Sequence, residues 1–126
     1  RGATDFSTNI DWKERAQLLR VMSHPVRLRI LEILSESSRC VKDLNSLVPI
    51  PQPYLSQHMA ALRRAKIVDS HAAGSLRCYY LLRPALIKKL IRLLRQEHVP
   101  HYRDRDSVRR EARRHEPVAV TTASVE

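Results

Sequence analysis

The chain has 126 residues, of which 43% are hydrophobic and 29% are charged, and this length and balance predict one globular domain rather than a disordered chain. Its 23 Lys and Arg residues outnumber 13 Asp and Glu residues, which gives a formal net charge of +10. The basic excess lies in residues 1–82 and again in residues 83–126. A positive field of this size favours an anionic partner, either nucleic acid or an acidic membrane surface.

Several classes of protein are disfavoured by the composition. Only two glycines occur, Gly2 and Gly74, so the chain lacks the glycine-rich loops that cradle phosphates in nucleotide enzymes. No catalytic triad or carboxylate pair stands out, so we expect neither an enzyme nor a cofactor. Two cysteines cannot make a disulfide framework, and no apolar run is long enough to span a bilayer. No secretion signal opens the chain, so we expect a cytoplasmic protein without a membrane partner.

Helical spacing of apolar residues predicts four helices in the first half of the chain. Asp11 opens the first helix, and Ser23 is the expected cap of the second, with Pro25 in its first turn. A polar turn over residues 35–39 ends the second helix. Three prolines between residues 49 and 53 separate the third helix from the fourth, which begins at Pro53. The predicted helices span residues 11–22, 24–36, 41–48 and 53–66.

A β-hairpin and a further helix are predicted in the second half. Residues 67–72 and 76–82 resemble two short strands around Gly74. A helix with a broad apolar face begins at Pro84, and Pro100 ends it. The domain therefore spans residues 11–99, between a flexible N-terminal arm, residues 1–10, and a basic, flexible C-terminal tail, residues 100–126. Residues 107–115 of this tail form at most a frayed helix.

This order of elements predicts a mainly α fold with a β-hairpin wing, the winged helix-turn-helix arrangement α-α-α-α-β-β-α. The second helix of such a pair enters the major groove of DNA. In the helix over residues 53–66, Leu55, Met59 and Leu62 share one face, whereas Gln57 and Arg64 lie opposite. A glutamine can form two hydrogen bonds with an adenine edge, and arginines hold phosphates.

Nine residues of this region and the wing are candidates for DNA binding, and several have a second interpretation. His58 is as compatible with hydrogen-bonded packing as with base contact. Tyr54 either approaches a sugar or packs under the wing, and Arg63 and Arg64 either touch phosphates or form a solvated face. The candidates are Gln52, Pro53, Tyr54, Ser56, Gln57, His58, Arg63, Arg64 and Arg77.

Five motifs lie in the stretch over residues 19–82, which is about half the chain: MSHPVRLRIL (22–31), CVKDL (40–44), QPYLSQHM (52–59), LR (62–63) and YYL (79–81). In this order and spacing they resemble the ArsR/SmtB family of prokaryotic winged-helix repressors. The resemblance implies a homodimer, built through the first and last helices, that binds a palindromic operator and is released by an effector. Pro51 departs from the family, which often has a Ser or Thr cap at this position.

The apolar face of residues 86–94 is wider than core packing requires, which favours a homodimer interface. The expected interface residues come from the first helix and from this one. They are Trp12, Leu18, Leu19, Leu86, Leu90 and Leu94.

The effector stays unassigned by the sequence. Arsenic-sensing members of the family carry a second cysteine where this chain has Lys42, and a soft-metal site needs three thiolates. His98 and His101 have a spacing used by zinc-sensing members, but the partner pair on the preceding turns is missing, so we expect no metal site. Cys40, at a helix start, and Cys78, in the wing, form either a thiol sensor or a pair of inert cysteines. A link between them requires the wing to approach the third helix.

The leading interpretation is a dimeric, sequence-specific transcriptional regulator, a repressor of the ArsR type that binds double-stranded operator DNA. Two alternatives stay open at this point. One is a winged-helix module that binds another protein, with the charge serving solubility. The other is an architectural protein that coats any DNA duplex with similar affinity.

Overall fold

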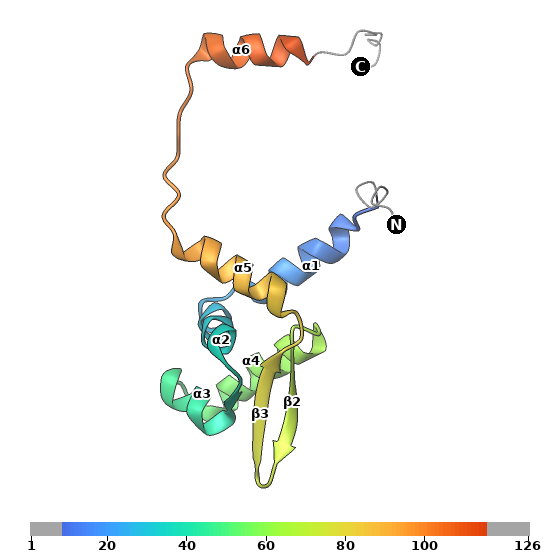
Figure 1. The fold of residues 1–126 in the computed structure, drawn as a ribbon, viewed down its shortest axis with the longest axis vertical. Helices are drawn as coiled ribbons and strands as arrows, with labels where there is room; N and C mark the ends of the chain where they lie inside the picture. Colours follow the sequence, from blue (N-terminus) through green and yellow to red (C-terminus); the bar gives the residue numbers. More distant parts are fainter. Residues whose placement is uncertain (1–8, 116–126) are drawn as a thin grey trace. The chain divides into compact units, whose positions relative to one another are not determined.

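The computed structural model describes residues 9–115, which form a helical protein with one small antiparallel sheet (Figure 1). The chain divides into two compact units, Arg1–Gln96 and Glu97–Glu126. The division lies a little before the predicted boundary at residue 99. The elements are α1 (Trp12–Met22), α2 (Pro25–Glu36), β1 (Arg39–Cys40), α3 (Val41–Leu47), α4 (Gln52–Arg64), β2 (Val68–Ala73), β3 (Leu76–Leu81), α5 (Pro84–Arg95) and α6 (Arg105–Arg114).

The first two helices begin at different kinds of cap. Asp11 caps α1 as expected, because its Oδ1 accepts hydrogen bonds from the backbone N–H groups of Lys13 and Glu14, both at 3.1 Å. The prediction that Ser23 caps α2 is wrong. His24 takes this role, since its extended backbone brings Nδ1 within 3.1 Å of the Val26 N–H, and Ser23 instead closes the end of α1. Pro25 lies in the first turn of α2, as predicted.

The sheet has three antiparallel strands in the order β1-β3-β2. The hairpin of β2 and β3 is as predicted, but its loop is tighter, since Ala73 pairs with Leu76 and leaves two residues in the turn. Gly74 has φ +63°, a conformation that favours glycine. The sequence predicted only a polar turn before α3. The structure adds β1 there, paired with β3 through Arg39↔Tyr79 and Cys40↔Cys78.

The core lies between α2, α4, α5 and the inner face of the sheet. The predicted face of α4 is confirmed as part of this core, since Leu55, Met59 and Leu62 are buried. On α5 only Ile87 and Ile91 are buried, so most of its apolar face is left on the surface. The helix ends at Arg95, where Gln96 turns extended, rather than reaching Pro100. Within residues 9–115, no helix combines the length and apolar character needed to cross a membrane.

The second unit contains α6, an arginine-rich helix capped by Asp104, which accepts a hydrogen bond from the Ser107 N–H at 3.0 Å. An ion pair of 2.7 Å joins Arg103 to Glu111 across its first turns. This helix begins two residues before the frayed helix that the sequence suggested and is well formed. Of the predicted arm, residues 1–10, and the predicted flexible tail, residues 100–126, the segments 1–8 and 116–126 lie outside the described residues.

Candidate nucleic-acid interface

α4 is the second helix of the helix-turn-helix pair, and it begins one residue earlier than predicted, at Gln52. Its N-cap is Pro51, which has no side chain able to cap. The Pro51 carbonyl accepts hydrogen bonds from the N–H groups of Tyr54 and Leu55 at 2.9 and 3.2 Å, which continues the helical pattern backwards. Pro53 has no N–H, and those of Tyr54 and Leu55 are bonded to Pro51, so the Gln52 N–H is the first-turn group available to a phosphate oxygen.

The outward face of α4 is polar and exposed. Gln52, Pro53, Ser56 and Gln57 are all exposed, and of these Pro53 and Gln57 lie on the side opposite the buried leucines and Met59. Tyr54 is 56% exposed, so its ring is not packed under the wing. The geometry thus presents Gln57 and its neighbours to solvent along one continuous surface.

His58 faces the protein rather than the solvent. It is half-buried, its Nδ1 accepts a hydrogen bond of 3.1 Å from Arg27 Nε, and its ring centre lies 4.6 Å from that of His24. Burial lowers the pKa of His58, and the nearby His24 and Arg27 lower it further. Arg27 also donates a hydrogen bond of 2.9 Å to the Val21 carbonyl. These contacts favour the packing interpretation of His58, which joins α4 to the start of α2.

The arginines near α4 and in the wing are exposed, with partners that leave them at the surface. Arg63 lies 3.6 Å from Asp69 on β2, and Arg77 Nη1 donates a hydrogen bond of 2.8 Å to Ser70 Oγ across the hairpin. Arg64 lines a groove of about 1000 Å³ between α1 and α4. The lining carries more basic than acidic side chains, since Arg20, Arg27, Arg83 and Lys13 accompany Arg64, against Asp11 and Glu14.

The turn between α3 and α4 is braced by Asn45, a residue that the sequence did not single out. Its Nδ2 donates hydrogen bonds to the carbonyls of Val48 and Ile50, at 3.2 and 2.9 Å. These bonds fix the proline-rich segment and so set the angle between the two helices. The available signal was an asparagine near the end of a short helix that leads into prolines, a position where side-chain to backbone bonds are common.

Comparison with known proteins places these elements in one family. The sequence model of the bacterial regulatory protein arsR family matches residues 24–70, which run from the cap of α2 into β2. The transcriptional regulator Rv0081 of Mycobacterium tuberculosis is 35% identical over 80 residues, which cover 63% of this chain and 70% of that protein. The chain belongs to the ArsR family.

Further relatives agree with this assignment. The transcriptional repressor SmtB of M. tuberculosis is 41% identical over 58 residues, 46% of this chain, but the match spans only 43% of SmtB. The crystal structure of Rv0081 superimposes with a TM-score of 0.61 at 31% identity, covering 82% of this chain and 94% of that one. The repressor BigR from Xylella fastidiosa gives 0.64 at 33% identity, covering 73% and 93%. All three relatives are named as regulators rather than enzymes, and these structures support the winged-helix fold.

A second surface of this ArsR-family chain is apolar and lies on α1 and α5. Of the residues expected at a dimer interface, four are exposed: Trp12, Leu19, Leu86 and Leu94. Leu18 and Leu90 are half-buried and pack partly against the core. The sequence did not include Leu93, which is 54% exposed on the same helix. The face is therefore present, although two of its expected members also serve the core.

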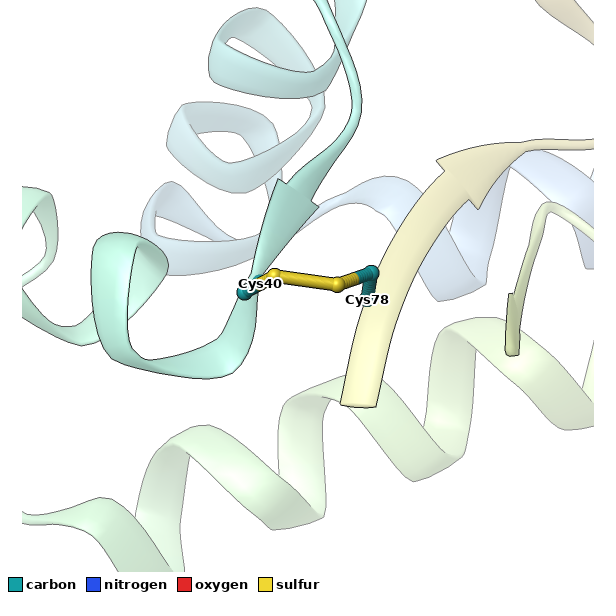
Figure 2. The surroundings of a disulfide bond; sticks show 2 residues. All are labelled: Cys40 and Cys78. Atoms are coloured by element: carbon teal, nitrogen blue, oxygen red, sulfur yellow. A yellow bond between two sulfur atoms is a disulfide. The ribbon is translucent and has the colours of Figure 1, made fainter. Parts of the chain in front are cut away.

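The two cysteines are joined. Cys40 is the N-cap of α3, and Cys78 lies in β3. The two residues are paired across β1 and β3, and a disulfide joins them (Figure 2). The wing therefore does approach the start of the third helix, and the condition that the sequence left open is met. In residues 9–115, no group of three or more His, Cys, Asp or Glu side chains is arranged to hold a metal ion.

Proposed function

We propose that this protein is a dimeric, sequence-specific DNA-binding repressor of transcription that inserts α4 into the major groove of an operator. The observation that carries the proposal is the division of α4 into two faces. Leu55, Met59 and Leu62 anchor it in the core, while Gln57 and the residues around it stand exposed. An anchored helix with an exposed polar face is what reading base edges requires.

Base contacts and phosphate contacts belong to different parts of α4. Gln57 lies at the middle of the exposed face, where it can donate to and accept from an adenine edge. Gln52 and Ser56 lie nearer the N-terminus, which no side chain caps, and their side chains suit phosphate oxygens, together with the Gln52 N–H. Arg63 and Arg64, at the other end of the helix, hold the phosphates that flank the groove.

The remaining candidates support this docking from the sides. Arg77 lies on the exposed part of the wing, from which it reaches the backbone of an adjacent groove. Tyr54 and Pro53 pack against a sugar at the entry of α4. His58, in contrast, supports DNA binding indirectly, because its bond with Arg27 fixes α4 against α2.

A dimer formed through α1 and α5 has two-fold symmetry, which matches the symmetry of a palindromic operator. These helices expose Trp12, Leu19, Leu86 and Leu94, an apolar set that a second copy would cover. The hairpin tip and α3 lie on the side of the first unit away from α5, so a dimer formed there leaves the DNA-binding elements accessible (Figure 1). Two reading helices about 34 Å apart would contact half-sites one helical turn apart.

The proposed site of action is the prokaryotic cytoplasm, where the chromosome lies. An effector that changes the relative orientation of the two reading helices would release the operator. The resemblance to the family is the reason to expect such an effector. Its identity stays unassigned, because potential metal ligands do not cluster in the described part of the chain.

Selection of bound duplexes from a random pool tests the proposal. The purified full chain is expected to enrich a palindromic sequence, and a scrambled version of the recovered duplex is expected to bind much more weakly at physiological salt. Similar affinity for both duplexes would instead identify an architectural DNA-coating protein. Absence of binding at low salt would favour the protein-interaction module and would overturn the proposal.

A further inference from the structure

The disulfide joins two elements that a DNA-binding winged helix must hold in register. Cys40 lies in β1 and directly precedes α3, the first helix of the helix-turn-helix pair, while Cys78 lies in β3 of the wing. Apart from the disulfide, β1 is tied to β3 by two residue pairs only, whereas β2 and β3 share six. The covalent bond therefore reinforces the shorter of the two strand pairings of the sheet, the one that joins the wing to the start of α3.

We propose that Cys40 and Cys78 form a reversible thiol–disulfide switch that sets DNA affinity, with the disulfide form as the tighter binder. This inference rests on the proposed function of α4 and the wing. In the disulfide form the wing and the helix pair move as one body, so less conformational freedom is lost when both contact the duplex. In the dithiol form the short β1–β3 seam opens more readily, and the wing binds with a larger entropic cost.

The position of the bond makes the wing the part that responds. Cys78 is followed in β3 by the buried Tyr79, which anchors the base of the wing, and is preceded by the exposed Arg77. The disulfide thus fixes β3 at the point where the strand, coming from the hairpin tip, enters the core. Both cysteine residues are half-buried, so neither is enclosed in the core away from a small thiol or disulfide.

The chemistry is a two-electron exchange with a low-molecular-weight disulfide as oxidant. The thiolate of one cysteine attacks the oxidant, forms a mixed disulfide and releases the first small thiolate. The thiolate of the other cysteine then displaces the second small thiolate and closes the Cys40–Cys78 bond. The protein loses two electrons to the oxidant, and the two thiol protons pass to solvent and the released thiolates. A small dithiol reverses the exchange and is itself oxidised to a disulfide.

The first part of the test uses the full chain without DNA. The protein is equilibrated with glutathione disulfide or with dithiothreitol, and mass spectrometry after alkylation counts free thiols. Amide hydrogen exchange then compares the two forms. We expect slower exchange in residues 76–81 of the disulfide form, and no redox response in a Cys40→Ser/Cys78→Ser variant. Failure of the bond to form, or equal exchange in both forms, would overturn the switch whatever the protein binds.

The second part measures affinity for the duplex recovered from the random pool, by fluorescence anisotropy. The disulfide form is expected to bind about tenfold more tightly than the dithiol form, and the double-serine variant is expected to match the dithiol form in both buffers. Equal affinities, or tighter binding by the dithiol form, would overturn the switch. If neither form prefers any duplex, the proposed function fails and control of DNA affinity fails with it. The exchange experiment still reports whether the bond restrains the wing.

Discussion

Gln57 separates sequence reading from general DNA attraction at the level of one side chain. It is exposed on α4 and has no structural role in the core, so Gln57→Ala removes base contacts without disturbing the fold. A bidentate contact contributes about 1–3 kcal/mol, so affinity for the selected duplex is expected to fall by a factor of about 5–150. Affinity for a scrambled duplex should not change. Gln96→Ala, a matched change beyond the end of α5, should leave both affinities as they are.

Arg64 is expected to behave differently, because a phosphate contact carries no sequence information. Arg64→Ala should weaken binding to the selected and the scrambled duplex by the same factor. It should also reduce the slope of log affinity against log salt concentration by about one. A salt titration of the variant measures both, with Arg92→Ala on the exposed side of α5 as the control. Loss of preference without a change in slope would contradict this role.

His58 makes the attachment of α4 sensitive to pH. Burial, His24 and Arg27 hold its pKa below 6.5 in the folded protein, so the unfolded chain binds a proton that the folded chain rejects. The free energy of unfolding therefore decreases as the pH falls from 6.5 toward the lowered pKa of folded His58. His58→Asn retains an acceptor for Arg27 but cannot titrate. Urea unfolding from pH 7.5 to 5 should therefore show a smaller loss of stability in the variant, and equal losses would contradict the contact.

At the scale of elements, the sequence predicted those whose pattern is local. The α4 face follows from 3.6-residue spacing, and the hairpin follows from two alternating segments around Gly74. β1 could not be predicted in this way, because a strand of two residues has no periodicity and exists only through its pairing with β3. The cap of α2 was misassigned because Ser is the commoner cap, whereas the backbone geometry at His24 decides the matter.

The candidate site shows the same distinction. The exposed side chains of α4 were predictable from their angular positions. The bond between Arg27 and His58 was not, since it joins residues 31 positions apart through the packing of two helices. The disulfide depends on the β1–β3 pairing and was hidden for the same reason. Long-range contacts of this kind require the fold before they can be seen.

The exposed apolar face of α5 allows a test of dimerisation. Leu94 is 56% exposed, so Leu94→Glu costs the isolated subunit little but places an unpaired charge in the proposed interface. The dimer dissociation constant is expected to rise at least 30-fold, about 2 kcal/mol, as measured by sedimentation velocity. Lys88→Glu, on the side of α5 away from the leucines, should leave the dimer intact. A variant dimer as strong as the original would place the interface elsewhere.

At the scale of the whole molecule, the disulfide restricts the conformations of the unfolded chain as well as the movement of the wing. It closes a loop with a sequence separation of 38 residues that contains α3, α4 and the hairpin. Loop closure of this length stabilises a folded domain by about 2–4 kcal/mol, mainly by reducing the entropy of the unfolded state. The disulfide form should therefore melt roughly 10 °C or more above the dithiol form. The Cys40→Ser/Cys78→Ser variant should melt with the dithiol form, with or without reductant. Because this measurement needs no DNA, coincident melting curves would show that the bond restrains neither the loop nor the fold, independently of what α4 binds.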